Sequence, residues 1–359
     1  MRIMIVTDAW FPQTNGVVIT LAQTAAWLGR FGHEVRLTTP KDFHTVPCPT
    51  YPEIRVAVFP YRQMAKRIAA FQPQALHIAT EGPLGLAARR YCVSHGLRFT
   101  TSYHTQFPQY LRSRYPIPMW ASYLALLWFH RAAERCMVST QSVRGQLHDR
   151  GFRNLAHWRR GVDTQLFRPQ SKAYLDLPRP IAAYVGRVAI EKNVDAFLRM
   201  PWAGSRIVIG DGPELPRLRA QYANVLYAGF QFGEDLAAYM AAADVLVFPS
   251  LTDTFGLVNL EAMACGVPVA AYPVTGPIDV VEDGVTGALD TDLARASLRA
   301  LNIDPRACRR RAEQSGWDIC TREFERNLVA CQPHIVQRPA LLTGAAPCTE
   351  SASRSTLRA

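Results

Sequence analysis

Short apolar runs alternate with amphipathic stretches along most of this chain of 359 residues. The first run, RIMIV, predicts a buried strand, and LAQTAAWLGRFG predicts a helix that ends at a glycine. HEVRLTT predicts the next strand, so that strand, turn, helix and strand form one βαβ unit. The runs IRVAVFP, ALHIAT, RFTTSYHT and RCMVST continue the pattern, which indicates a parallel sheet with helices on its faces.

A second series of strands begins at IAAYVGR, after the linker SKAYLDLPRP. RIVIG, VLYAGF and ADVLVFPS follow as further short runs of strand-forming residues. The length fits two domains of ordinary size, and the 48% of apolar residues supply a substantial core for each. The final residues, 333–359, are rich in Pro, Ser, Thr and Ala, and this composition predicts a disordered tail.

Charge is unevenly distributed along the chain, whose formal net charge is +11. Residues 1–172 hold 22 Lys and Arg against 8 Asp and Glu, whereas residues 173–359 hold 18 against 21. The basic half is therefore expected to meet an anionic surface or substrate. No run approaches 18 apolar residues, which argues against a membrane span, and the first residues predict a strand and not a signal peptide. Eight scattered Cys without CxxC spacing argue for reduced thiols in the cytoplasm and against a zinc site.

Residues 250–271, SLTDTFGLVNLEAMACGVPVAA, carry the most chemical information. They predict a loop with Asp253 after a buried strand, then a helix that contains Glu261. In open α/β sheets, such loops lie at the carboxyl ends of the strands, where ligands bind. The main-chain N–H groups of Phe255, Gly256 and Leu257 can bind an anion at the start of the helix. Glu261 lies about one turn into that helix. A carboxylate there is better suited to accept hydrogen bonds from ligand hydroxyls than to bind an anionic ligand.

The loop after IAAYV supplies positive charge. In GRVAIEK, Arg187 follows Gly186 and stands five positions before Lys192, and Asn193 is the expected N-cap of the next helix. Two fixed cations beside a helix N-terminus make a clamp for a diphosphate. Gly16, in the first βα turn, would allow a phosphate or sugar to approach the main chain closely.

Residues 250–271 resemble the acid-x7-acid signature of family-4 retaining glycosyltransferases, which have the GT-B fold. The first acid is Asp253 in TDTFG, where the usual pattern has Glu. This variant resembles the subgroup with sulfolipid synthases, diacylglycerol glycosyltransferases and GDP-mannose-dependent α-mannosyltransferases. GRVAIEK, GDGP and SYHT match further family motifs in the expected order. The resemblance implies an α/β protein in which two Rossmann-like domains face each other across a cleft, with a C-terminal helix that returns to the first. The implied parts are an acceptor-side domain at 1–168, a nucleotide-sugar domain at 175–307 and the returning helix at 308–330.

The resemblance also gives roles to individual residues. Arg187 and Lys192 would stabilise charge on the leaving diphosphate, Asp253 would contact sugar hydroxyls, and Glu261 would hold the ribose. His104, at the end of RFTTSYHT, would contact and orient the sugar. The predicted catalytic residues are thus His104, Arg187, Lys192, Asp253 and Glu261. The predicted donor-binding residues are Gly16, Gly186, Gly210, Gly212, Gly229, Phe230, Phe255, Gly256 and Leu257, and those on the acceptor side are Glu81, Gly82 and Tyr103.

The implied reaction transfers a hexose from a nucleotide sugar with retention of configuration. It needs no cofactor beyond the donor substrate and no metal, because GT-B enzymes bind the diphosphate through Arg and Lys. The DTD at Asp290 to Asp292 is therefore interpreted as a surface loop and a helix cap. No carboxylate nucleophile stands out, in agreement with a front-face mechanism in which the leaving phosphate takes the proton of the acceptor.

The acceptor is less well defined by the sequence. Residues 107–128, FPQYLRSRYPIPMWASYLALLW, are dense in aromatics and Arg, which fits a membrane-surface patch or an acceptor groove and equally an ordinary buried helix. With the basic first half, this stretch favours a lipid acceptor such as diacylglycerol and a position at the inner face of the cytoplasmic membrane.

Other functions stay open at this point. One is a GDP-mannose-dependent α-mannosyltransferase that acts on a mannolipid or polysaccharide, and another is a GT-B protein that binds a nucleotide sugar without turnover. A Rossmann dehydrogenase fits poorly because the first βα turn, DAWFPQTNG, lacks GxGxxG. The sequence contains no nucleic-acid-binding motif, so nucleic acid is not an expected partner.

Overall fold

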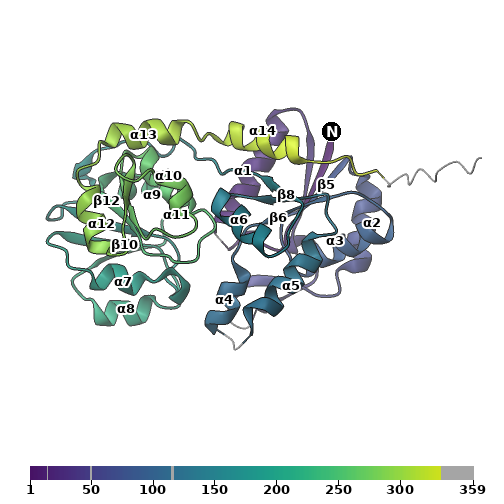
Figure 1. Cartoon of the computed structure of the whole chain (residues 1–359), viewed down its shortest axis with the longest axis horizontal. Helices are drawn as coiled ribbons and strands as arrows, with labels where there is room; N and C mark the ends of the chain where they lie inside the picture. Colours follow the sequence, from purple (N-terminus) through teal and green to yellow (C-terminus); the bar gives the residue numbers. More distant parts are fainter. Residues whose placement is uncertain (14, 49–50, 115–116, 333–359) are drawn as a thin grey trace, which may run out of the picture.

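The computed structural model describes all residues except 14, 49–50, 115–116 and 333–359. Two six-stranded parallel sheets, each covered by helices, form two α/β domains side by side (Figure 1). The predicted disordered tail lies outside the described residues.

The first sheet has the strand order β2-β1-β5-β6-β7-β8, and a separate antiparallel hairpin, β3-β4, follows β2. Neighbouring strands are parallel throughout the sheet. Its strands are short and apolar, as in β1, where Ile3 to Val6 are completely buried. The elements are β1 (Arg2–Val6), α1 (Gly16–Arg30), β2 (Glu34–Thr38), η1 (Pro40–Asp42), β3 (Thr45–Cys48), β4 (Tyr51–Ala57), α2 (Tyr61–Phe71), β5 (Ala75–Ile78), α3 (Pro83–Ser94), β6 (Thr100–Tyr103), α4 (Phe107–Arg114), α5 (Met119–His130), β7 (Arg135–Val138), α6 (Gln141–Asp149) and β8 (Leu155–His157).

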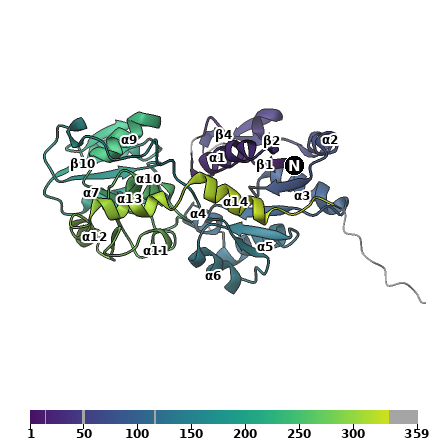
Figure 2. The same ribbon diagram turned by 90° about the horizontal axis from the view of Figure 1, so that it is seen from above.

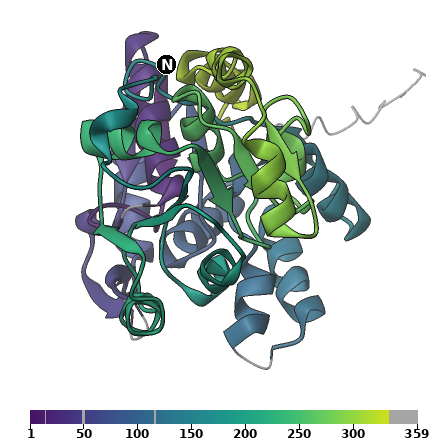
Figure 3. The same cartoon turned by 90° about the vertical axis from the view of Figure 1, so that its left-hand side faces the viewer.

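The second sheet has the order β11-β10-β9-β12-β13-β14 and is again parallel. All five residues of its central strand β9 are buried, because helices cover both faces of the sheet. Figure 3 views the molecule with this domain toward the reader. The elements are η2 (Lys172–Tyr174), β9 (Ile181–Val185), η3 (Ile190–Lys192), α7 (Val194–Arg199), β10 (Ser205–Ile209), α8 (Leu215–Gln221), β11 (Leu226–Gly229), α9 (Gly233–Ala242), β12 (Val245–Phe248), α10 (Leu257–Ala264), β13 (Val269–Ala271), α11 (Pro277–Val280), β14 (Gly287–Leu289) and α12 (Leu293–Ala300).

Both sheets contain a switch point, where consecutive connections leave the sheet in opposite directions. In the first sheet it lies between β1 and β5, and in the second between β9 and β12. The loops at the carboxyl ends of these strands diverge and leave room for a ligand, which is the general binding position in open α/β sheets. The stretches singled out in the sequence follow β9 and β12, so the topology places them together.

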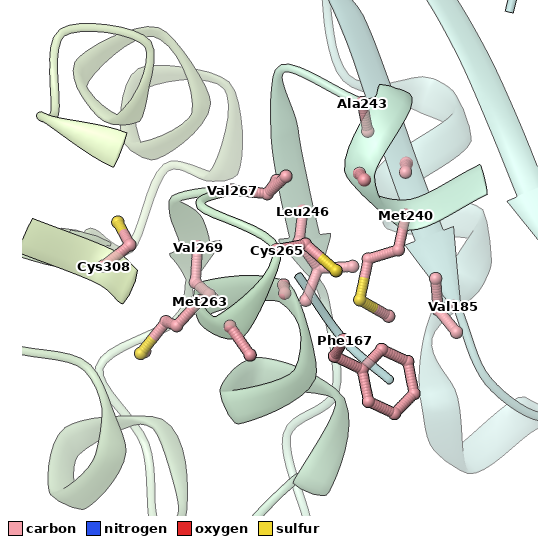
Figure 4. Packing of buried hydrophobic residues seen from close by; sticks show 14 of the residues in the cluster. Phe167, Val185, Met240, Ala243, Leu246, Met263, Cys265, Val267, Val269 and Cys308 are labelled. Atoms are coloured by element: carbon pink, nitrogen blue, oxygen red, sulfur yellow. The ribbon is translucent and has the colours of Figure 1, made fainter. Parts of the chain in front are cut away.

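The core of the second domain is closed by residues from the preceding segment. Phe167 packs with Val185, Met240 and Cys265 (Figure 4), and Val162 belongs to the same cluster. Both residues precede position 168, where the first domain was expected to end. The chain therefore begins to pack in the second domain before it reaches β9.

The chain returns to the first domain through two helices and not one. The sequence predicted a single helix over 308–330, whereas the structure has α13 (Pro305–Glu313) and α14 (Trp317–Asn327), which follow one another across both domains (Figure 2). Gly316 caps α14 in an extended conformation, and a Cβ on Gly161 would lie 2.8 Å from the Cα of Trp317. The close crossing of these two backbones breaks the helix. Cys308 and Ala312 of α13 lie in the second core, and Cys320 and Phe324 of α14 lie in the first.

Candidate functional site

The loop between β12 and α10 is held against the first domain by hydrogen bonds. The Thr254 hydroxyl donates to the main-chain oxygen of His104 at 2.7 Å, and the hydroxyls of Ser139 and Thr140 donate to the Thr254 carbonyl at 3.1 and 3.2 Å. The Gln106 amide donates to the Asp253 carbonyl at 3.2 Å. The acidic loop thus meets first-domain residues that follow β6 and β7, which brings the predicted donor and acceptor sides together.

The start of α1 also meets the second domain nearby. Asn15 caps α1 by accepting hydrogen bonds from the N–H groups of Val17 and Val18 at 3.0 and 3.1 Å, which fixes the start of the helix. A Cβ on Gly16 would lie 3.4 Å from Cδ1 of Leu257, so the N-termini of α1 and α10 approach each other. Gly16 and Leu257, both predicted to bind donor, therefore lie side by side.

The N-terminus of α10 presents main-chain donors. Gly256 takes a left-handed conformation (φ 81°) at the N-cap, which turns the chain into the helix. Within the described part of the chain, the N–H groups of Phe255, Gly256 and Leu257 donate no hydrogen bond. The buried hydroxyls of Ser250 and Thr252 likewise find no partner among the described residues. Because buried polar groups are nearly always paired, these donors are available to a polar or anionic ligand.

The predicted cation and acid lie in direct contact. The Lys192 ammonium donates to both oxygens of Asp253, at 2.6 and 2.8 Å, and both side chains are mostly shielded from solvent. The Tyr184 hydroxyl donates to the Arg187 carbonyl at 2.6 Å, which holds the loop of Arg187 and Lys192 against β9. The loops after β9 and β12 thus bring the Lys192 ammonium and the Asp253 carboxylate together just before the N-terminus of α10, and Arg187 belongs to the same loop as Lys192.

Asn193 is the N-cap residue of α7, as the sequence predicted, but it has a left-handed backbone (φ 52°) and its side chain makes no capping hydrogen bond. Its amide donates instead to the carbonyl of Pro249 at 3.2 Å. This contact joins the start of α7, at the end of the loop after β9, to the end of β12, because Pro249 directly follows β12. Asn193 therefore fixes the spacing of the two site loops.

Burial and Arg160 make His104 a neutral hydrogen-bond donor. The Arg160 guanidinium approaches Nδ1 of His104 at 3.1 Å, and a guanidinium can only donate. Nδ1 must therefore accept, which places the ring proton on Nε2. Burial first and the charge of Arg160 second hold the pKa of His104 well below its usual range. Nε2 is buried and has no partner among the described residues, so it can donate to a ligand oxygen.

Arg160 was not predicted from the sequence. It is 4% exposed and lies against the ring of Trp158, with its guanidinium carbon 4.3 Å from the ring centroid. The only local signal was its place in RRGVDTQLF, before the second domain. Arg160 acts on the protonation of His104, and this depends on a contact between residues 56 positions apart, which a single sequence does not reveal.

Glu261 is largely shielded from solvent and, among the described residues, has no charged partner that would stabilise its ionised form. Burial raises the pKa of its carboxyl from 4.5 to about 7. The carboxyl lies about one turn from the free N–H groups of α10, as the sequence predicted. A ligand hydroxyl would provide the hydrogen bond that this group lacks.

Replacing Glu261 with Gln should stabilise the protein at high pH. A carboxyl with a raised folded-state pKa contributes most below the unfolded value near 4.5, and that stability is lost as pH rises to about 7. Glutamine stays neutral, so we expect a gain on the order of 2 kcal/mol at pH 8, roughly 3 °C in Tm, and little change at pH 4. Thermal unfolding across this range is the measurement, with exposed Glu34→Gln as the control. A variant less stable than wild type at pH 8 would mean that the ionised carboxylate is stabilised by contacts.

The predicted acceptor-side residues are divided between site and core. Glu81 follows β5 and accepts a hydrogen bond from Nε2 of His130 at 3.1 Å. Tyr103, by contrast, is 1% exposed and packs in the core with Tyr123, so the structure does not place it among the side chains near the facing domain.

Position 82 must be a glycine because the carboxyl of Asp8 occupies the space that a side chain would need. Asp8 was not predicted from the sequence. A Cβ on Gly82 would lie 2.5 Å from the Asp8 carboxyl carbon. Asp8 follows β1 and accepts hydrogen bonds from Thr80 and from the N–H of Leu84, both at 2.8 Å, so it caps α3 from across the switch point. Burial raises the pKa of Asp8 to about 6.

The glycines of the second domain serve loop packing. A Cβ on Gly210 would lie 1.9 Å from the carbonyl oxygen of Gly186, and one on Gly212 would lie 2.3 Å from that of Val188. Gly210 and Gly212 therefore allow the loops after β9 and β10 to touch each other, and their contact with the donor stays a prediction. Gly229 ends β11, and Phe230 beyond it is 52% exposed.

The Asp290 to Asp292 segment acts as a loop and cap, as interpreted. Asp292 accepts hydrogen bonds from the N–H groups of Ala294 and Arg295 at the start of α12. Asp290 pairs with Arg295, and this hydrogen bond holds the pKa of the Asp290 carboxyl far below its usual range. Both acids therefore have structural partners within the domain.

Comparison with known proteins identifies the relatives of this chain. Residues 14–166 match the model described as Glycosyltransferase Family 4, and residues 179–302 match Glycosyl transferases group 1. A GDP-mannose-dependent alpha-mannosyltransferase from Mycobacterium tuberculosis is 30% identical over 80% of this chain and 83% of its own length. An alpha-monoglucosyldiacylglycerol synthase from Streptococcus pneumoniae is 26% identical over 90% and 83%.

The fold comparison agrees with these relatives. The structure of sucrose-phosphate synthase from Thermosynechococcus elongatus superposes with a TM-score of 0.74 over 90% of this chain and 97% of that chain, at 21% identity. The two parallel-sheet domains therefore have the GT-B arrangement, as the sequence motifs predicted.

Proposed function

This chain belongs to the family-4 glycosyltransferases, and we propose that it transfers a hexosyl unit, with retention, from a nucleotide-diphosphate sugar to a diacylglycerol-type membrane lipid. The observation that carries the proposal is the grouping at the domain contact. Free N–H groups of α10, the Lys192–Asp253 pair, the Arg187 loop and the neutral His104 meet there.

The chemistry follows from the charges of these groups. In the reaction, the bond between the anomeric carbon and the diphosphate oxygen breaks, and the acceptor oxygen forms a bond to the same face of that carbon. The acceptor proton passes to the leaving diphosphate. Arg187, Lys192 and the N–H groups of α10 stabilise the negative charge that accumulates on the diphosphate. Neutral His104 donates from Nε2 to the sugar, and Glu261 accepts from ribose hydroxyls. No metal is needed for these steps.

A lipid acceptor is supported by the surface of α5. Trp120, Leu124 and Trp128 are spaced four residues apart, so they share one helical face, and they are 68%, 56% and 46% exposed. Arg89 stacks on Trp128 with its guanidinium carbon 3.8 Å from the ring centroid. Figures 1 and 3 show α4 and α5 projecting from the first domain. Exposed Trp beside Arg, in the basic half of the chain, suits the interface of an anionic membrane.

In the described part of the chain, no helix is both long and apolar enough to cross a membrane. We therefore propose peripheral attachment through α5, at the inner face of the cytoplasmic membrane. The face opposite Trp120 is buried against the core through Tyr123, Leu126 and Phe129, so α5 can offer its apolar face to lipid without leaving the domain.

A second candidate concerns donor and acceptor together. The Mycobacterium tuberculosis relative carries GDP-mannose in its name, which favours GDP-mannose as donor and a mannolipid or polysaccharide as acceptor. The chemistry at the site is the same in both cases, because the diphosphate and the anomeric carbon are common to all these donors.

The proposal is tested by incubating the protein with GDP-mannose, UDP-glucose and UDP-galactose, each with vesicles that contain diacylglycerol and anionic lipid. We expect transfer of one hexose in the presence of EDTA, and an α-glycoside by NMR of the product. A β-glycoside would contradict retention, and activity restored only by Mg²⁺ or Mn²⁺ would contradict the metal-free clamp.

Sedimentation of the same vesicles provides the control for membrane attachment. The protein should pellet with them at low salt and be released as salt rises, because basic residues contribute about 1 kcal/mol each near an anionic surface. A protein that ignores anionic vesicles at low salt, yet glycosylates a soluble polysaccharide, would favour the second candidate.

A further inference from the structure

A separate cavity of about 200 Å³ lies in the first domain. Its walls come from the loop after β1, the turn after β2 and the β3–β4 hairpin, through Trp10, Gln13, Lys41, Phe43 and Arg55 among others. Figure 2 shows α1, β2 and β4 on the same side of this domain. The cavity is therefore at the carboxyl ends of β1 and β2, the edge where parallel sheets bind ligands.

The cavity lies next to the domain contact. The loop that carries Trp10 and Gln13 continues through Asn15 into Gly16, which approaches Leu257 at the N-terminus of α10. A molecule bound in the cavity would therefore lie on the first-domain side, against a loop whose end at Gly16 approaches Leu257 of the predicted donor site.

The charges in the cavity point to an anion. Lys41 and Arg55 are both exposed there, and the described lining contains no carboxylate. The neighbouring Asp42 is already engaged, because its carboxylate accepts a hydrogen bond from the N–H of Thr39 at 2.9 Å and pairs with Arg67. Arg55 is held in place by two hydrogen bonds to Thr45, at 3.1 and 3.0 Å. One cation is thus fixed and the other is on a flexible stem, which together suit a phosphate.

The rest of the lining suits a polyol. Gln13 is 6% exposed, its amide oxygen accepts from Asn15, and within the described residues its amide nitrogen donates to no partner. Trp10 and Phe43 present aromatic surface, which packs against the C–H groups of a sugar or polyol while hydroxyls bind elsewhere. The volume admits a small headgroup and not an acyl chain.

We propose that this cavity binds the phosphate-bearing polyol headgroup of the acceptor. The inference rests on the proposed glycosyl transfer and replaces neutral diacylglycerol as the preferred acceptor by a diacylglycerol-type lipid with an anionic headgroup, with Lys41 and Arg55 on the phosphate and Gln13 on a hydroxyl. The same chemistry occurs in a phosphatidyl polyol and in a free polyol phosphate, so the experiment must distinguish these two sources.

The test compares acceptors at constant surface charge. The vesicles carry either phosphatidylinositol and phosphatidylglycerol or the neutral lipids diacylglycerol and monoglucosyldiacylglycerol, and the fraction of phosphatidylserine is adjusted so that the total fraction of anionic lipid is the same in both sets. Glycerol 3-phosphate and inositol phosphate without vesicles form the soluble arm. We expect kcat/KM to favour the phosphorylated acceptors, and Lys41→Gln to lower the ratio of phosphorylated to neutral turnover about tenfold. Lys41→Arg should restore the ratio.

Lys66→Gln is the matched control, because Lys66 is an exposed lysine on α2 of the same domain. Its ratio should equal that of wild type. A ratio unchanged in Lys41→Gln, or a wild-type enzyme that uses neutral lipids equally well, would overturn the headgroup subsite while leaving the glycosyltransferase intact. Absence of transfer from any donor to every lipid and soluble polyol would instead overturn the proposed function, and the subsite with it.

Discussion

Replacing Arg187 with Ala should lower kcat at least ~100-fold while the fold stays intact. Arg187 follows β9 at the switch point of the second sheet, where its loop faces the N-terminus of α10. A cation there acts on charge that develops only as the sugar–phosphate bond breaks, so its loss raises the barrier more than it weakens binding. Removing one such preorganised donor costs on the order of 3 kcal/mol.

The measurement is kcat at saturating donor, with thermal unfolding to verify the fold. Arg199→Ala is the matched control, because Arg199 belongs to the same domain, is 66% exposed and, among the described residues, forms an ion pair with Asp195 alone. Arg187→Lys should recover part of the rate, since it keeps the charge but not the planar fork. A wild-type kcat in Arg187→Ala would remove this residue from the diphosphate site.

Much of the fold could be predicted from the sequence because the relevant signals are local. Strands of parallel sheets are short continuous apolar runs, and those at Ile181–Val185 and Val245–Phe248 are buried in full. Loops that follow such strands must lie at one edge of the sheet, so the motif residues of GRVAIEK and TDTFG were bound to come together. The resemblance to a family then predicted that the two sheet domains face each other.

What could not be predicted depends on contacts between distant residues. Lys192 and Asp253 are 61 positions apart, and nothing in either loop shows that they form an ion pair. Asp8 caps α3 from 76 positions away, and Tyr103 is buried because α5 covers it. The headgroup cavity combines three segments that are unremarkable by themselves. Each of these contacts depends on where side chains point and what they pack against, and the pattern of apolar residues in the sequence predicts neither.

The Lys192–Asp253 ion pair leads to the second prediction, that these two residues act as a unit. Lys192→Ala should lower kcat about 1000-fold, more than Arg187→Ala, because it removes a cation and also leaves the Asp253 carboxylate unpaired beside the diphosphate. Asp253→Asn should cost about 100-fold, since it loses a sugar contact and no longer holds the lysine.

The double variant distinguishes a unit from two separate contributions. If Asp253 acts largely by orienting Lys192, its removal matters little once the lysine is gone, and the double variant should lose about 1000-fold, like Lys192→Ala alone. Independent roles would multiply to about 100,000-fold. Single-turnover rates at saturating donor provide the comparison, with thermal unfolding of all four proteins as the check on folding. A multiplicative result would mean that the ion pair gives way when the diphosphate binds, leaving Lys192 to the phosphate and Asp253 to the sugar.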